Sequence, residues 1–78
     1  MKIKQIGSNM TVLTLNNGTE ILFSYETPVA GFSGTSYAYR YFKTDEKWSK
    51  TTTRHVNKYL NGQDAAILGQ WEINEMVS

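Results

Sequence analysis

The chain of 78 residues contains no cysteine, one proline and one histidine. Without cysteine it cannot form disulfides, zinc–thiolate sites or a thiol nucleophile. Secreted domains of this size usually depend on cross-links, so the absence favours a reducing, cytoplasmic compartment. Residues 1–5 show no signal-peptide pattern, and the longest uncharged apolar-rich stretch, residues 27–38, is too short to span a bilayer. We therefore expect a soluble protein that makes no use of a membrane.

The remaining composition is that of one folded domain. Hydrophobic residues make up 40% of the chain and charged residues 19%, which argues against disorder. A chain of this length can build one core, so we expect a single domain over residues 1–78, of modest stability and open to homo-oligomerisation. Five Tyr, three Phe and two Trp must supply much of that core.

The first half of the chain has the pattern of an antiparallel meander. We expect strands at residues 2–6, 10–15, 20–26, 29–32 and 37–43. Between the second and third strands, a three-residue loop with Gly18 in the left-handed conformation pairs Leu13 with Ile21. This register separates one largely apolar face from one polar face. The apolar face holds Leu13, Leu15, Ile21, Phe23 and Tyr25. The polar face holds Thr14, Glu20 and Ser24 and is expected to be the outer face of the hairpin. Pro28, which lacks an amide donor, is expected to begin an edge strand or to follow a bend.

Residues 51–60 change to helical spacing. Apolar and half-polar residues fall on one helix face, namely Thr52, His55, Val56, Tyr59 and Leu60. Ser49 or one of Thr51 to Thr53 caps the start, and Asn61-Gly62 is a left-handed stop. Trp48 is expected to fasten this helix to the sheet. The predicted fold is therefore α+β: an antiparallel four- to five-stranded meander packed against one short helix, with a second helix at residues 70–77 as an option.

Charge is sorted along the sequence. Residues 40–58 hold six Lys/Arg and two acids, a net +4, whereas residues 59–78 hold three acids and no base, a net −3. Lys50, Arg54 and Lys58 recur every four residues and form a basic stripe on the helix face away from Val56. Such a stripe is either a solvated helix surface or a docking surface for acidic protein or phosphates. Lys47 lies just before it.

Two groups of aromatic residues have two interpretations each. Tyr37, Tyr39 and Tyr41 alternate along one strand face and are either part of the core or a platform for stacking bases. Trp71 has polar and acidic neighbours and either folds onto the core or is exposed as a binding hot spot.

No residue pattern indicates catalysis. His55 next to Thr51 and Thr52 lacks an orienting acid, so we expect a half-buried, hydrogen-bonded histidine. A lone imidazole without cysteine or a carboxylate cluster predicts no metal site. Gly31 and Gly34 are too sparse for a phosphate-binding loop. We therefore expect a protein that is not an enzyme and takes no cofactor.

Two segments, SYETPVAGF (24–32) and YFKTDEKWSKTTTRHVNKYLNG (41–62), carry a resemblance to a known group of sequences. They resemble a group of small uncharacterised bacteriophage proteins in which a Thr-Pro-Val-Ala strand precedes a Tyr/Thr-rich strand and a Trp/Tyr-Ser-x-Thr-Thr-x-x-His-x-Asn-x-Trp/Tyr-Leu motif. The residues that match are Thr27 to Ala30, Trp48, Ser49, Thr51, Thr52, His55, Asn57, Tyr59 and Leu60. The insert at residues 33–40 departs from the pattern. The resemblance implies a phage origin and a setting in the host bacterial cytoplasm, and it brings no known activity.

The expected function is binding. We expect a small phage-type accessory protein that binds a host or phage protein. One form of this hypothesis is an inhibitor of a bacterial defence complex. The alternative is a nucleic-acid-binding module that uses the basic helix face, although a net charge of +1 argues against strong nonspecific binding. The contact surface is either the basic stripe or the acidic tail. The candidate binding residues are Lys47, Lys50, Arg54, Lys58 and Trp71.

Overall fold

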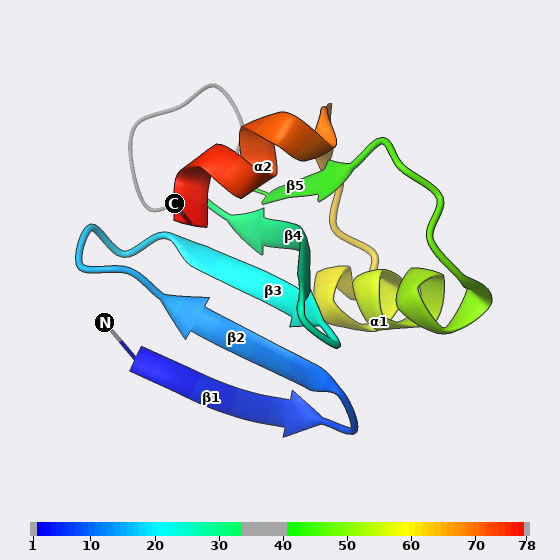
Figure 1. Ribbon diagram of the computed structural model, residues 1–78, viewed down its shortest axis with the longest axis horizontal. Helices are drawn as coiled ribbons and strands as arrows, with labels where there is room; N and C mark the ends of the chain where they lie inside the picture. The colour runs from blue at the N-terminus through cyan, green and yellow to red at the C-terminus, as the bar shows by residue number, and fades with distance from the viewer. Residues whose placement is uncertain (1, 34–40, 78) are drawn as a thin grey trace.

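The computed structural model describes residues 2–33 and 41–77. Six strands in these ranges form one sheet in sequence order: β1 (Lys2–Gly7), β2 (Met10–Thr14), β3 (Glu20–Ser24), β4 (Thr27–Phe32), β5 (Tyr41–Thr44) and β6 (Ala66–Leu68). Helix α1 (Lys50–Leu60) connects β5 to β6, and helix α2 (Gln70–Val77) follows β6. The chain is therefore an α+β domain, as its sequence predicts (Figure 1).

The two helices cover opposite faces of the sheet. Neighbouring residues of a strand point to opposite faces, and in β3 Leu22 packs in the cluster with α1 whereas Ile21 packs in the cluster with α2. The buried members of the α1-side cluster are Met10, Val12, Leu22, Val29, Ala30, Val56 and Leu60. Those of the α2-side cluster are Ile21, Phe42 and Ile73. In Figure 1 the sheet accordingly separates α1 from α2.

The hairpin between β2 and β3 has the predicted register. Leu13 pairs with Ile21, and Gly18 takes a left-handed φ of 87°. The Leu15 amide donates to the Thr19 carbonyl at 2.8 Å, which closes the three-residue loop. The hydrophobic pattern and one glycine were sufficient to define this pairing.

The face predicted to be polar and outward is instead buried under α1. Ser24 is 2% exposed, and the half-buried Glu20 accepts a hydrogen bond from an α1 side chain. The third strand also ends earlier than expected, because Tyr25 takes a left-handed φ of 57° in a two-residue turn and is 53% exposed. The prediction failed because one helix packs on each face of the sheet. Neither face of β3 is therefore exposed to solvent.

Strand β4 begins two residues earlier than expected and contains a bulge. Leu22 pairs with Ala30 but Phe23 pairs with Pro28, so Val29 is the extra residue on β4. Pro28 is tolerated inside the strand because β5 pairs with β4 only from Ala30 to Phe32.

Gly31 marks the closest approach of β4 to its neighbours. A Cβ atom at this position would collide with the Glu20 backbone carbonyl and with the Phe42 ring. The absence of a side chain therefore allows the fully buried Phe42 ring to approach the backbone of β4 closely.

Strand β5 is described from Tyr41 onwards, so Tyr37 and Tyr39 of the expected tyrosine row lie outside the described residues. Tyr41 is half-buried and packs edge-on against Phe32 and Tyr59, with ring centroids 5.0 and 6.2 Å apart. For Tyr41 the core interpretation is confirmed. Strand β6, which pairs in parallel with β5 after the α1 crossover, was not expected.

Candidate functional site

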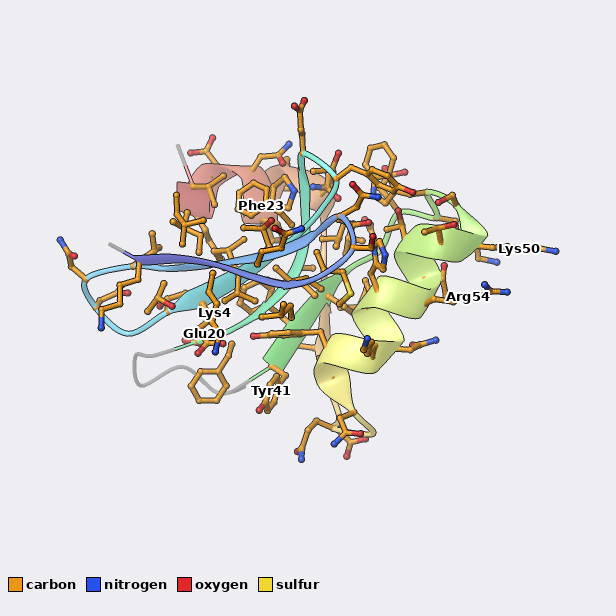
Figure 2. The ribbon with its side chains drawn as sticks, turned by 90° about the horizontal axis from the view of Figure 1, so that it is seen from below. Lys4, Glu20, Phe23, Tyr41, Lys50 and Arg54 are labelled. Atoms are coloured by element: carbon orange, nitrogen blue, oxygen red, sulfur yellow. The ribbon has the colours of Figure 1, made fainter. Side chains whose placement is uncertain are left out.

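Helix α1 carries the basic stripe. Its cap is Ser49, one of the predicted candidates, so the helix begins at Lys50, one residue before the predicted start, and it ends at Leu60 as predicted. The Ser49 side chain accepts from the Thr52 amide at 3.1 Å, and Asn61, with φ 49°, donates its amide to the Asn57 carbonyl. Because Thr52, Val56 and Leu60 are buried, the opposite side of the helix faces solvent. Lys50, Arg54 and Lys58 are all exposed, and Figure 2 shows Lys50 and Arg54 pointing away from the sheet.

Buried hydrogen bonds fix the first half of α1 against β3. The Ser24 hydroxyl lies 2.7 Å from His55 Nδ1 and 3.0 Å from Thr52 Oγ1. The expectation of a half-buried, hydrogen-bonded histidine is confirmed, but its partner on β3 was not foreseen. Since Ser24 is almost fully enclosed, its hydroxyl positions the helix and has no room to approach a substrate.

A second polar contact fixes the end of α1. The Tyr59 hydroxyl donates to Glu20 Oε1 at 3.1 Å. Burial raises the pKa of Tyr59 well above its usual value, and the adjacent Glu20 carboxylate raises it further. The phenol therefore remains a hydrogen-bond donor throughout the physiological pH range.

A groove of about 920 Å³ opens beside the first half of α1. Its walls are α1 and the linker of residues 45–49, and its floor is formed by β5 and β6, where Lys43 pairs with Ile67. Four cations line it: Lys43, Lys47, Lys50 and Arg54. Two acids, Asp45 and Glu46, line it as well, so the groove has a net charge of +2. In Figure 1 the β5–α1 linker, whose residues line the groove, curves from the end of β5 to the start of α1.

The groove also exposes apolar surface. The side chain of Trp48 is 50% exposed and that of Ile67 is 65% exposed, and both line the groove. Trp48 was expected to fasten α1 to the sheet, but it is not a member of either buried cluster. The indole ring is too exposed to be part of the core, and its N–H donates to Gln70 Oε1 at 3.3 Å.

Gln70, the first residue of α2, holds this side of the groove together. Its Oε1 accepts from the Thr44 hydroxyl at 2.7 Å in addition to Trp48, and its Nε2 donates to the Pro28 carbonyl at 2.7 Å. One side chain thus links β4, the end of β5, the linker and α2. Sequence reasoning did not single out Gln70, because a glutamine without periodic neighbours carries no signal of its contacts.

The structure brings together only part of the predicted site. Lys47, Lys50 and Arg54 line the groove, whereas Lys58 lies one turn further along α1, beyond its lining. Trp71 is 69% exposed on α2, outside the groove, and its ring lies against Gly69. Ile67 was missed because β6 was not predicted. The only available signal was the short apolar run of residues 65–68 before a glycine.

Within residues 2–33 and 41–77, no three His, Asp or Glu side chains are grouped so that they could hold a metal ion. No helix in these ranges combines the length and the apolar character needed to cross a membrane.

The fold and the groove define a class of protein: a small α+β domain with a mixed sheet, helices on both faces and a basic groove beside the last strand. The chain matches the model of a family of unknown function, DUF8033, over residues 1–75, and it belongs to that family. No curated protein and no solved structure matches it.

Proposed function

We propose that this protein is a binding module whose groove holds an acidic segment of a partner protein. The observation that supports the proposal is the composition of the groove, which combines exposed cations at Lys47, Lys50 and Arg54 with exposed apolar surface at Trp48 and Ile67. Exposed apolar side chains in a concave site with a charged rim are typical of protein–protein contacts.

Nucleic acid is the second candidate, because an aromatic ring beside cations can stack a base while the cations contact phosphates. The low overall charge favours protein. Nucleic-acid binding needs many phosphates to be neutralised, and the chain's net charge of +1 offers little neutralisation beyond the groove.

The resemblance of segments 24–32 and 41–62 to small phage proteins extends the proposal. In a phage setting the partner is a host or phage protein, and a module that only binds acts by obstructing it. A bacterial defence complex is one such target. Binding would require no catalytic group in this chain.

The test is a selection of random 12-residue peptides against the full chain. Peptides that bind should be enriched in Asp and Glu and should contain an apolar side chain. The double variant K50E/R54E should weaken their binding roughly tenfold or more, because two rim cations become repulsive. The control is K58E, which reverses one cation, against two in the double variant, on the same helix outside the groove and should leave affinity within about twofold.

Two outcomes would contradict the proposal. The first is a set of selected peptides with no excess of acids. The second is equal weakening by K58E, which would indicate attraction to overall charge. Fluorescein-labelled 20-nucleotide single and double strands serve as competitors. If they bind more tightly than every selected peptide, with a steep salt dependence that K50E/R54E abolishes, the nucleic-acid function replaces the protein one.

A further inference from the structure

We infer that the acidic segment binds as an extended strand added to the open edge of β6, an inference that rests on the proposed function above. The sheet order is β1 to β6, so β6 has β5 on one side and no strand of the described residues on the other. An edge strand presents backbone N–H and C=O groups that a peptide can pair with.

The backbone of β6 is oriented so that the N–H and C=O groups of Ile67 point toward the open edge of the sheet. The Asp45 amide donates to the Leu68 carbonyl at 2.9 Å, so the backbone polar groups of Leu68 face β5. Along a strand these groups alternate in direction from one residue to the next. The N–H and C=O of Ile67 therefore point away from β5, toward the position of an added strand.

An added strand would have two different environments on its two faces. On the α1 side it lies along the groove, whose lining includes the Ile67 side chain and, at the rim, the outward-pointing cations Lys50 and Arg54. On the α2 side Trp71 lies against Gly69, directly after β6, with most of its ring exposed. Because strand side chains alternate between faces, the ligand is a segment in which acidic residues toward α1 alternate with apolar residues toward Trp71.

The opposite edge of the sheet is built differently. Strand β1 is longer and carries Lys2 and Lys4, both exposed. Lysines on an edge strand suppress pairing with other chains. Strand β6 carries no charged residue. Of the two edges, β6 is therefore the one open to strand addition, and it is also the one beside the groove.

The experiment uses the full chain and the tightest-binding peptide from the selection. N-methylation of the peptide, one position at a time, leaves the protein unaltered and removes one backbone donor each time. Strand addition predicts that methylation at every second position within the bound segment weakens binding roughly tenfold or more, while the intervening positions tolerate it. Amide exchange measured by NMR should slow at Ile67 when the peptide binds and stay unchanged at Ile3 on β1.

The outcomes separate this inference from the proposed function. If acidic peptides bind through Lys50 and Arg54 but methylation shows no alternation, strand addition is wrong and the acidic-segment function stands. Protection at Ile3 instead of Ile67 would likewise overturn the inference, because β1 would then be the docking edge. If no acidic peptide is selected, both fail. If Trp71→Ala loses binding and sensitivity to N-methylation alternates along the peptide, the peptide has acidic side chains toward α1 and apolar side chains toward Trp71, as inferred. If Trp71→Ala retains full affinity, Trp71 does not contact the peptide.

Discussion

The two faces of the sheet are stabilised by different chemistry. Under α2 the buried cluster is apolar, with Ile21, Phe42 and Ile73 fully enclosed, and the part-buried hydrogen bonds of Gln70 lie at the start of the helix. Under α1 an apolar cluster is joined by buried polar side chains, Ser24 and Thr52, that bond across from strand to helix. Apolar contacts stabilise without fixing direction, whereas a satisfied polar network specifies one arrangement. On the face that carries the groove, a hydrogen bond enclosed within the core, between Ser24 and Thr52, helps to specify the position of the helix.

The largest effect is expected on the apolar face. Replacing Ile73, which has no exposed surface, by alanine should lower the free energy of unfolding by about 3 kcal/mol, because a cavity remains where α2 meets the sheet. Chemical denaturation measures the change, and Ile3→Ala on the exposed edge strand is the control, with an expected change below about 0.5 kcal/mol. Equal losses in the two variants would mean that α2 does not pack as described.

A smaller effect is expected from the polar face. Ser24→Ala removes the hydroxyl shared by His55 and Thr52 and should cost about 1–2 kcal/mol, since the buried Thr52 and the half-buried His55 each lose a hydrogen bond. Ser8→Ala, in the exposed turn between β1 and β2, is the control. Ser24→Ala should also reduce peptide affinity, because α1 loses its fixed position. Unchanged stability and affinity would show that the network does not locate the helix.

The end of α1 provides a pH test. Tyr59→Phe should cost about 1 kcal/mol at neutral pH, because the hydrogen bond to Glu20 is lost. The folded-state pKa of Tyr59 lies above the usual 10.0. Its contribution is complete below pH 10 and declines as the pH rises further, because the unfolded phenol ionises first. The stability difference between wild type and variant should therefore shrink above pH 10. A constant difference from pH 7 to 11 would contradict the assignment.

The smallest effect is expected on the outer side of α1. Lys58→Ala removes a cation from the last helical turn and should cost only about 0.3–0.5 kcal/mol, through the helix dipole. Thermal denaturation at low and high salt measures it, and salt should abolish the difference. A cost above about 1 kcal/mol would indicate that the basic stripe holds the fold together and is less available for binding.

Local signals in the sequence were sufficient for much of this fold. Gly18 and the alternation around it gave the register of β2 and β3, and the Ser49 and Asn61-Gly62 signals gave the ends of α1. The outward direction of Lys50, Arg54 and Lys58 followed from the helical period alone. These features depend on residues close together in the chain, which is why the sequence could predict them.

The remaining part of the site depends on residues far apart. Strand β6 has three residues, which are too few for a periodic signal. It pairs in parallel with β5, from which it is separated in the sequence by the whole of α1. Without β6, neither the groove nor the place of Ile67 and Trp48 can be predicted. The assignment of Ser24 and Glu20 to an outward face failed for the same reason. The helices that pack on the two faces of the sheet are distant in sequence from β3.

The parallel pairing of β5 with β6 also affects the order in which the molecule folds. Strands β1 to β4 follow one another through short turns, whereas Lys43 meets Ile67 from 24 positions away. Contacts between distant residues form slowly, since the intervening chain must first be ordered. The antiparallel meander is thus expected to assemble early, and the chain acquires its binding surface only in the last stage of folding.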